Sequence, residues 1–183
     1  MIGTNIGKKI GIALAVLAII VAAIYLVPRL RVKAPTEIQK VPEEMRSVTL
    51  FFGNKQADGF VPETREVAVA RTFEDQVQTV LCELIKGAHD GNLMNAIPQG
   101  TELIRVFWVE DSQTLLLDFN AAFTANHPGG STGEYFTIGT IIKTISANFP
   151  QVAKVQFLID GATVESIAGH YAVDTPIDIK KWR

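Results

Sequence analysis

The stretch GGSTGEYF, residues 129–136, combines a glycine-rich loop with groups that can carry protons. His127 lies just before it, and Glu134 lies within it. A phosphate loop requires GxxxxGK[ST] after a strand and a dinucleotide site requires GxGxxG, and the stretch matches neither pattern. The spacing from Ser131 to Glu134 fits a capping box, in which each side chain accepts a hydrogen bond from the other residue's backbone N–H. We therefore predict that Ser131 and Glu134 cap the start of a helix.

A catalytic or metal site would need more groups than the sequence brings together. His89, His127 and His170 fall in separate predicted loops, without the short spacing that a metal site requires. Asp118 and Asp160 end predicted strands, where aspartate more often forms a cap or a turn than an acid–base pair. No segment assembles a nucleophile, a base and oxyanion donors. We expect no enzymatic activity, no metal and no cofactor.

The charge distribution argues against a nucleic-acid partner. The chain has 183 residues and a formal net charge of −2. Residues 1–33 contain five basic residues and no acidic one, so that the rest holds 12 basic against 19 acidic residues. An acidic domain lacks the positive surface that phosphate backbones demand. The only cysteine in the sequence is Cys82, which excludes an intramolecular disulfide.

An uncharged apolar run occupies residues 10–27. Its length is near the lower limit for a helix that spans a bilayer. A cleaved signal peptide is the alternative, but its apolar region is usually shorter and is followed by small residues, whereas this run ends in Tyr25, Leu26 and Val27. We predict one transmembrane helix within a basic-flanked anchor at 1–33, followed by a linker at 34–46.

The rest of the chain carries alternating strand and helix patterns. Strands are predicted at 47–53, 60–69, 103–109, 114–119 and 153–159, and helices at 73–86 and 134–149. Thr72 is the expected cap of the first helix, and Pro62 favours an edge position for its strand. The core order β-α-β-β-α-β predicts an α+β domain at 47–178, with both helices on one face of a mixed sheet. Residues 179–183 are predicted to be a tail.

Candidate contact residues come from surfaces that this arrangement would leave uncovered. The hairpin strand 103–109 is apolar at both parities, so one of its faces requires cover from the tail or from a partner. Cys82 lies opposite the apolar side of its helix. We predict Phe51, Cys82 and Trp108 as partner contacts.

Several segments together are similar to one known family. They are LCELIKG (81–87), NLMNAIPQGTEL (92–103), LLLDFN (115–120), GGSTGEYF (129–136), TISANFPQVAKVQFLIDGA (144–162) and IAGHYAVDTPI (167–177). In combination they resemble the GerMN domain family of bacterial spore-germination proteins, over roughly residues 47–177. The resemblance implies a single extracytoplasmic domain related to the ring-building motifs of sporulation machinery, which acts by protein–protein assembly and not by catalysis. This chain departs from the family's namesake, because it has one copy of the domain where the namesake has two.

The resemblance also implies an orientation and a function. With the domain outside the cytoplasm, the N-terminus is cytoplasmic and the protein crosses the bacterial cell membrane once. We expect an envelope assembly module that binds a protein partner or forms homo-oligomers, linked to sporulation or germination. The alternative is a domain that binds cell-wall glycans or small ligands through loops 120–133 and 165–175. For that alternative the candidate pocket residues are Phe123, His127, Tyr135, His170 and Tyr171.

Overall fold

The computed structural model describes residues 4–26 and 44–182, which belong to two separate units. The first contains helix α1, Thr4–Leu26, whose apolar side chains from Ile10 to Tyr25 are largely exposed. Within the described residues, no helix reaches the length and hydropathy needed to cross a membrane. The transmembrane helix therefore stays a prediction. Most of the predicted linker, residues 34–43, lies outside the described residues.

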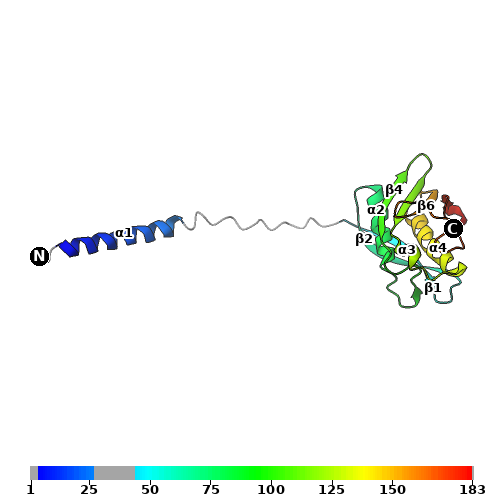
Figure 1. The fold of residues 1–183 in the computed structure, drawn as a ribbon, viewed down its shortest axis with the longest axis horizontal. Helices are drawn as coiled ribbons and strands as arrows, with labels where there is room; N and C mark the ends of the chain where they lie inside the picture. Colours follow the sequence, from blue (N-terminus) through cyan, green and yellow to red (C-terminus); the bar gives the residue numbers. More distant parts are fainter. Residues whose placement is uncertain (1–3, 27–43, 183) are drawn as a thin grey trace. The chain divides into compact units, whose positions relative to one another are not determined.

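The second unit follows the predicted order of strands and helices and adds four short elements (Figure 1). The predicted elements are β1 (Met45–Asn54), β2 (Phe60–Ala68), α2 (Phe73–Ile85), β4 (Leu103–Val109), β5 (Thr114–Phe119), α4 (Ser131–Asn148) and β6 (Lys154–Ile159). The additions are β3 (Leu93–Met94), α3 (Ala122–Ala125), β7 (Ile177–Asp178) and the 3-10 helix η1 (Ile179–Trp182). The mixed α+β class is confirmed.

The strands form two sheets, so the prediction of one mixed sheet is wrong. One sheet has the order β2-β1-β3 and the other has the order β4-β5-β6-β7. Among the described strands only β3 pairs with the second edge of β1, at Gly53 and Asn54, and side chains of α4 bond to the rest of that edge. Asn148 accepts from the Thr49 N–H at 3.0 Å and donates to the Thr49 carbonyl at 2.7 Å, and Thr144 accepts from the Phe51 N–H at 3.0 Å. A helix thus replaces the missing strand.

The residues that begin and end α2 are those that the sequence predicts. The Thr72 hydroxyl accepts from the backbone N–H of Asp75 at 3.1 Å, which satisfies one of the free donors of the first turn. Gly87 follows the last turn with φ +91°, a conformation that favours glycine. Pro62 lies on β2, which is an edge strand.

The two sheets share one hydrophobic core with helices α2 and α4. Its buried members run from Val48 in β1 to Ile179 in η1. Ile179 is almost fully buried, and η1 packs against α4. The folded domain therefore extends through residue 182, and the prediction of a tail from 179 is wrong. Since all of these core residues lie between 48 and 179, a fragment of residues 44–183 contains the complete core.

Candidate functional site

The glycine-rich stretch does start a helix, but not through a capping box. The N-cap of α4 is Gly130, with φ +83°, and no side chain caps it. The carboxylate of Glu134 is fully buried and accepts the backbone N–H groups of Ile167, Ala168 and His170 at 2.8–3.1 Å. The predicted pair of Ser131 and Glu134 is wrong, because three donors from a distant loop occupy the carboxylate.

Those donors also set the protonation of Glu134. Burial by itself would raise the pKa of its carboxyl group, but the surrounding backbone N–H donors lower the pKa below its ordinary value. The Glu134 side chain is therefore ionised, and its hydrogen bonds join α4 to the loop 167–170. All of its described hydrogen bonds serve this packing, so Glu134 does not form a catalytic pair with His127.

His127 links its own loop to the loop at Ala96 through the Thr137 side chain of α4. Its Nδ1 accepts the backbone N–H of Gly129 at 3.0 Å, so its Nε2 carries the proton and donates to the Thr137 hydroxyl at 3.0 Å. That hydroxyl donates in turn to the Ala96 carbonyl at 2.6 Å. Burial lowers the pKa of His127, which agrees with a neutral ring.

The remaining titratable candidates also take structural roles. Asp118 is fully buried, and its two oxygens accept from Arg105 Nη2 at 3.1 Å and from the Gly161 N–H at 2.7 Å. Asp160 is exposed in the adjoining turn at φ +48°. In the part of the chain that the structure describes, no group of three or more ligand-type side chains could hold a metal.

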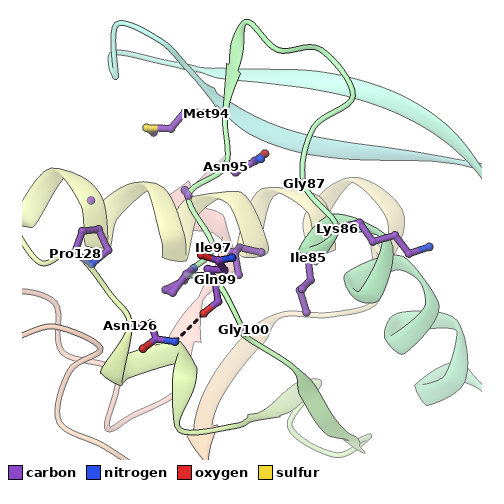
Figure 2. Close-up of a pocket in the computed structure, with 13 residues that line it drawn as sticks. Ile85, Lys86, Gly87, Met94, Asn95, Ile97, Gln99, Gly100, Asn126 and Pro128 are labelled. Atoms are coloured by element: carbon purple, nitrogen blue, oxygen red, sulfur yellow. Dashed lines mark hydrogen bonds between the residues drawn. The ribbon is translucent and has the colours of Figure 1, made fainter.

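A cleft of about 490 Å³ lies between three segments of the domain (Figure 2). Its walls are the end of α2 at residues 85–87, the segment 94–100 and the segment 126–133. The last two segments are tied together, since Asn126 Nδ2 donates to the Gln99 carbonyl at 2.8 Å. Sequence reasoning associated the 94–100 segment with the family resemblance but did not predict it as a site.

Gly87 lines this cleft, and Arg65 holds its carbonyl group. A Cβ atom at Gly87 would lie 2.6 Å from Asn95 Nδ2, so glycine is needed for this close approach. The Gly87 carbonyl accepts from the buried Arg65 guanidinium, which also pairs with Glu63 and Glu83. Burial opposes ionisation of Glu63, yet the hydrogen bond from Arg65 and the neighbouring backbone N–H groups lower its pKa overall.

Strand β4 carries a second feature, an exposed apolar stripe formed by Ile104, Phe107 and Val109. These side chains are 40–44% exposed, although β4 is ordered within a sheet. A register shift between Leu103 and Arg105 accompanies the outward position of Ile104. Because β4 is the first strand of its sheet, its outer backbone edge pairs with no described strand. The strand therefore offers both an apolar face and free hydrogen-bonding groups.

The three predicted contact residues lie on different parts of the domain. Trp108 points inward and is half-buried against Phe73, with ring centroids 5.0 Å apart. Phe51 is half-buried beside a hollow of about 220 Å³, and Cys82 is exposed on α2. Although Cys82 as a whole is exposed, partial burial of its thiol raises the pKa of that group. Their role in partner contact stays a prediction, and the structure does not gather them into one surface.

The pocket expected from the aromatic loop residues forms only in part. Phe123 is buried in the core and stacks on Phe119. Tyr135 and Tyr171 do approach each other, with centroids 6.2 Å apart, and Trp182 stacks on Tyr135 at 5.0 Å. His127 and His170 are engaged in loop contacts instead, on Thr137 and beside Glu134.

A family model described as "Germane: Sporulation and spore germination" matches residues 49–165, which is more than half of the chain. The chain belongs to the Germane family. The predicted GerMN resemblance is thereby confirmed. No curated protein matches the sequence significantly.

Solved structures show the same GerMN fold. A candidate lipoprotein from Clostridium perfringens aligns with a TM-score of 0.54 and 24% identity, over 75% of this chain and 89% of that one. The tandem GerMN domains of GerM from Bacillus subtilis align at 0.55 and 14% identity, over 75% and 48%. The first GerMN domain of that protein aligns at 0.52 and 17% identity, over 73% and 94%. The Germane domain of this chain thus spans about half of the tandem protein.

Proposed function

We propose that this Germane-family chain is a non-enzymatic assembly module of the bacterial envelope, linked to sporulation or germination. The observation that carries the proposal is strand β4, which combines an edge that no described strand pairs with and the exposed stripe Ile104–Phe107–Val109. Such an edge tends to add a strand from another chain, with backbone hydrogen bonds supplying affinity and the side chains supplying specificity. The occupant we propose is β4 of a second copy.

A symmetric antiparallel pairing fits this strand. With Phe107 opposite its own equivalent on a two-fold axis, Arg105 of one copy would lie opposite Val109 of the other, so that no like charges face each other within the pair. The Arg105 guanidinium is already held by Asp118, and its stem would add to the apolar contact. The interface would remove the three exposed side chains from water.

Attachment to the membrane is the second part of the proposal. The N-terminal apolar run is uncharged from residue 10 to residue 27, and basic residues flank it on both sides. We propose that this segment anchors the chain, with the Germane domain outside the cytoplasm. The full-length chain is then expected in the membrane fraction and resistant to carbonate extraction, whereas deletion of residues 1–33 is expected to release it.

Self-association is tested on the fragment 44–183 by sedimentation velocity over a concentration series. Val109→Lys places a charge within the stripe, opposite Arg105 of the second copy, and is expected to abolish the oligomer. Val69→Lys is the matched control, because Val69 is 39% exposed just after β2, which belongs to the other sheet, and should leave association unchanged.

The same variants are then compared in cells by cross-linking of the full-length chain. A fragment that is monomeric at high concentration, together with no cross-linked product in cells, would overturn the assembly proposal. Equal effects of the two lysine variants would also overturn it, since the stripe would then have no special role.

A further inference from the structure

The polar atoms that line the 490 Å³ cleft indicate the chemical class of a ligand. Among the described residues that line it, Lys86 carries the only formal charge. The Lys86 ammonium is bound to Glu83 Oε2, and its side chain is 69% exposed. The cleft thus contains no carboxylate for a cation and no free cationic group for an anion. Its surface is suited to a neutral ligand with both apolar and polar parts.

Two amide side chains leave one donor and one acceptor for such a ligand. Asn95 Oδ1 accepts the Ala88 N–H at 2.7 Å, which fixes the orientation of the amide and leaves Nδ2 as a donor. Asn126 Nδ2 donates to the Gln99 carbonyl, which leaves Oδ1 as an acceptor. Among the described residues, neither Asn95 Nδ2 nor Asn126 Oδ1 has a hydrogen-bond partner.

A third polar group lies behind the cleft. Thr140 Oγ1 is buried and has no hydrogen-bond partner among the described residues. It faces a hollow of about 10 Å³ that shares Ile85, Gly87, Asn95, Ala96 and Ile97 with the cleft. This volume suits one water molecule, and a buried hydroxyl needs a partner of this kind. The hydroxyl therefore places a polar group in a hollow that adjoins the cleft through these shared residues.

We propose that the cleft binds a small neutral ligand carrying a secondary amide. The ligand carbonyl accepts from Asn95 Nδ2, and the ligand N–H donates to Asn126 Oδ1. A water on Thr140 Oγ1 occupies the adjoining hollow and supports this end of the cleft, while the apolar part of the ligand lies against Ile85 and Ile97. An N-acetylated sugar and an acylated peptide share this chemistry, and both are distinguished in the test below.

The test uses amide chemical shifts of the ¹⁵N-labelled fragment 44–183. The probes are N-acetyl-D-glucosamine and N-acetyl-L-alanine N′-methylamide, and D-glucose is the probe without an amide. Shifts that map to 85–87, 94–100 and 126–133 with a Kd on the order of 1 mM are expected for at least one amide probe. The amide probe that binds identifies the source, and D-glucose should produce no such shifts.

Two variants connect the binding to the proposed geometry. Ala96→Leu fills the cleft and should weaken binding at least ~10-fold, whereas Ala147→Leu on the exposed side of α4 should leave it unchanged. Thr140→Val keeps the side-chain shape and should weaken binding ~3–10-fold through loss of the water site. The fold of each variant is checked from the dispersion of the same spectrum.

Three results would overturn the inference. They are no shifts with either amide probe, equal shifts with D-glucose, and unchanged affinity in both Ala96→Leu and Thr140→Val. The result is independent of self-association, because Val109→Lys should bind the amide probe normally.

Discussion

Replacing Glu134 by glutamine tests whether the buried carboxylate holds the loop 167–170 in place. The carboxylate accepts three backbone N–H groups, two at Oε1 and one at Oε2. Glutamine keeps one oxygen, so its best orientation retains the two bonds at Oε1 and turns an NH₂ group toward the His170 N–H. The loss of one charge-assisted bond and the weakening of two others should cost about 2–3 kcal/mol. For a domain of this size, the melting temperature should fall by about 6–9 °C.

The pH dependence of this effect has a defined sign. The pKa of Glu134 in the folded domain lies below its ordinary value, so its stabilising contribution is present above the ordinary pKa and is lost as pH falls through the folded-state pKa. The difference between wild type and Glu134→Gln should therefore shrink in acid. Thermal unfolding of fragment 44–183, followed by circular dichroism between pH 3 and 7, measures it.

A matched control is available in the same region. Glu165 is exposed, and Glu165→Gln should change the free energy of unfolding by less than about 0.5 kcal/mol. If Glu134→Gln lowers the melting temperature no more than Glu165→Gln does, the carboxylate does not fasten the loop. A difference that grows in acid would refute the assigned ionisation state.

Three further predictions concern other parts of the domain. Arg65→Met should destabilise it by about 3 kcal/mol in urea unfolding, because two glutamates and two backbone carbonyls lose their buried partner, whereas Arg71→Met on the surface should have little effect. Gly139→Ala should lower the melting temperature although alanine favours helices, since the new methyl group would collide with the ring of Phe60; a rise would show that the ring moves freely. Cys82 should react with iodoacetamide as one exposed thiol, but more slowly at pH 8 than a free cysteine, because burial raises the pKa of its thiol; an equal or faster rate would contradict this.

The strand and helix order was predictable because it depends on neighbours in the chain. The alternation of apolar residues places the β4–β5 hairpin correctly, and Thr72 marks the start of α2 through a contact three residues away. The glycine-rich stretch likewise marks the start of α4 near Ser131. Combined segment patterns were also enough to indicate the family.

The cleft could not be predicted from the same patterns. It needs the end of α2 beside segments 94–100 and 126–133, and its useful atoms are those left over after Asn95 and Asn126 have bonded to the backbone. A sequence shows that an amide is present but not which of its atoms is already occupied. The stripe on β4 is predictable only in part. The sequence shows that the strand is apolar at both parities, but packing decides that Phe107 is exposed while Trp108 lies against Phe73.

The sequence by itself determined the elements, their order and the family, since each is specified by local spacing and by residue type. Tertiary structure decided what the polar side chains do. Glu134 bonds to a loop more than 30 residues away instead of to Ser131, and Asn148 takes the place of a strand beside Thr49, almost 100 residues away. A buried polar group must find partners wherever the folded chain places them, and that placement depends on packing across the whole domain.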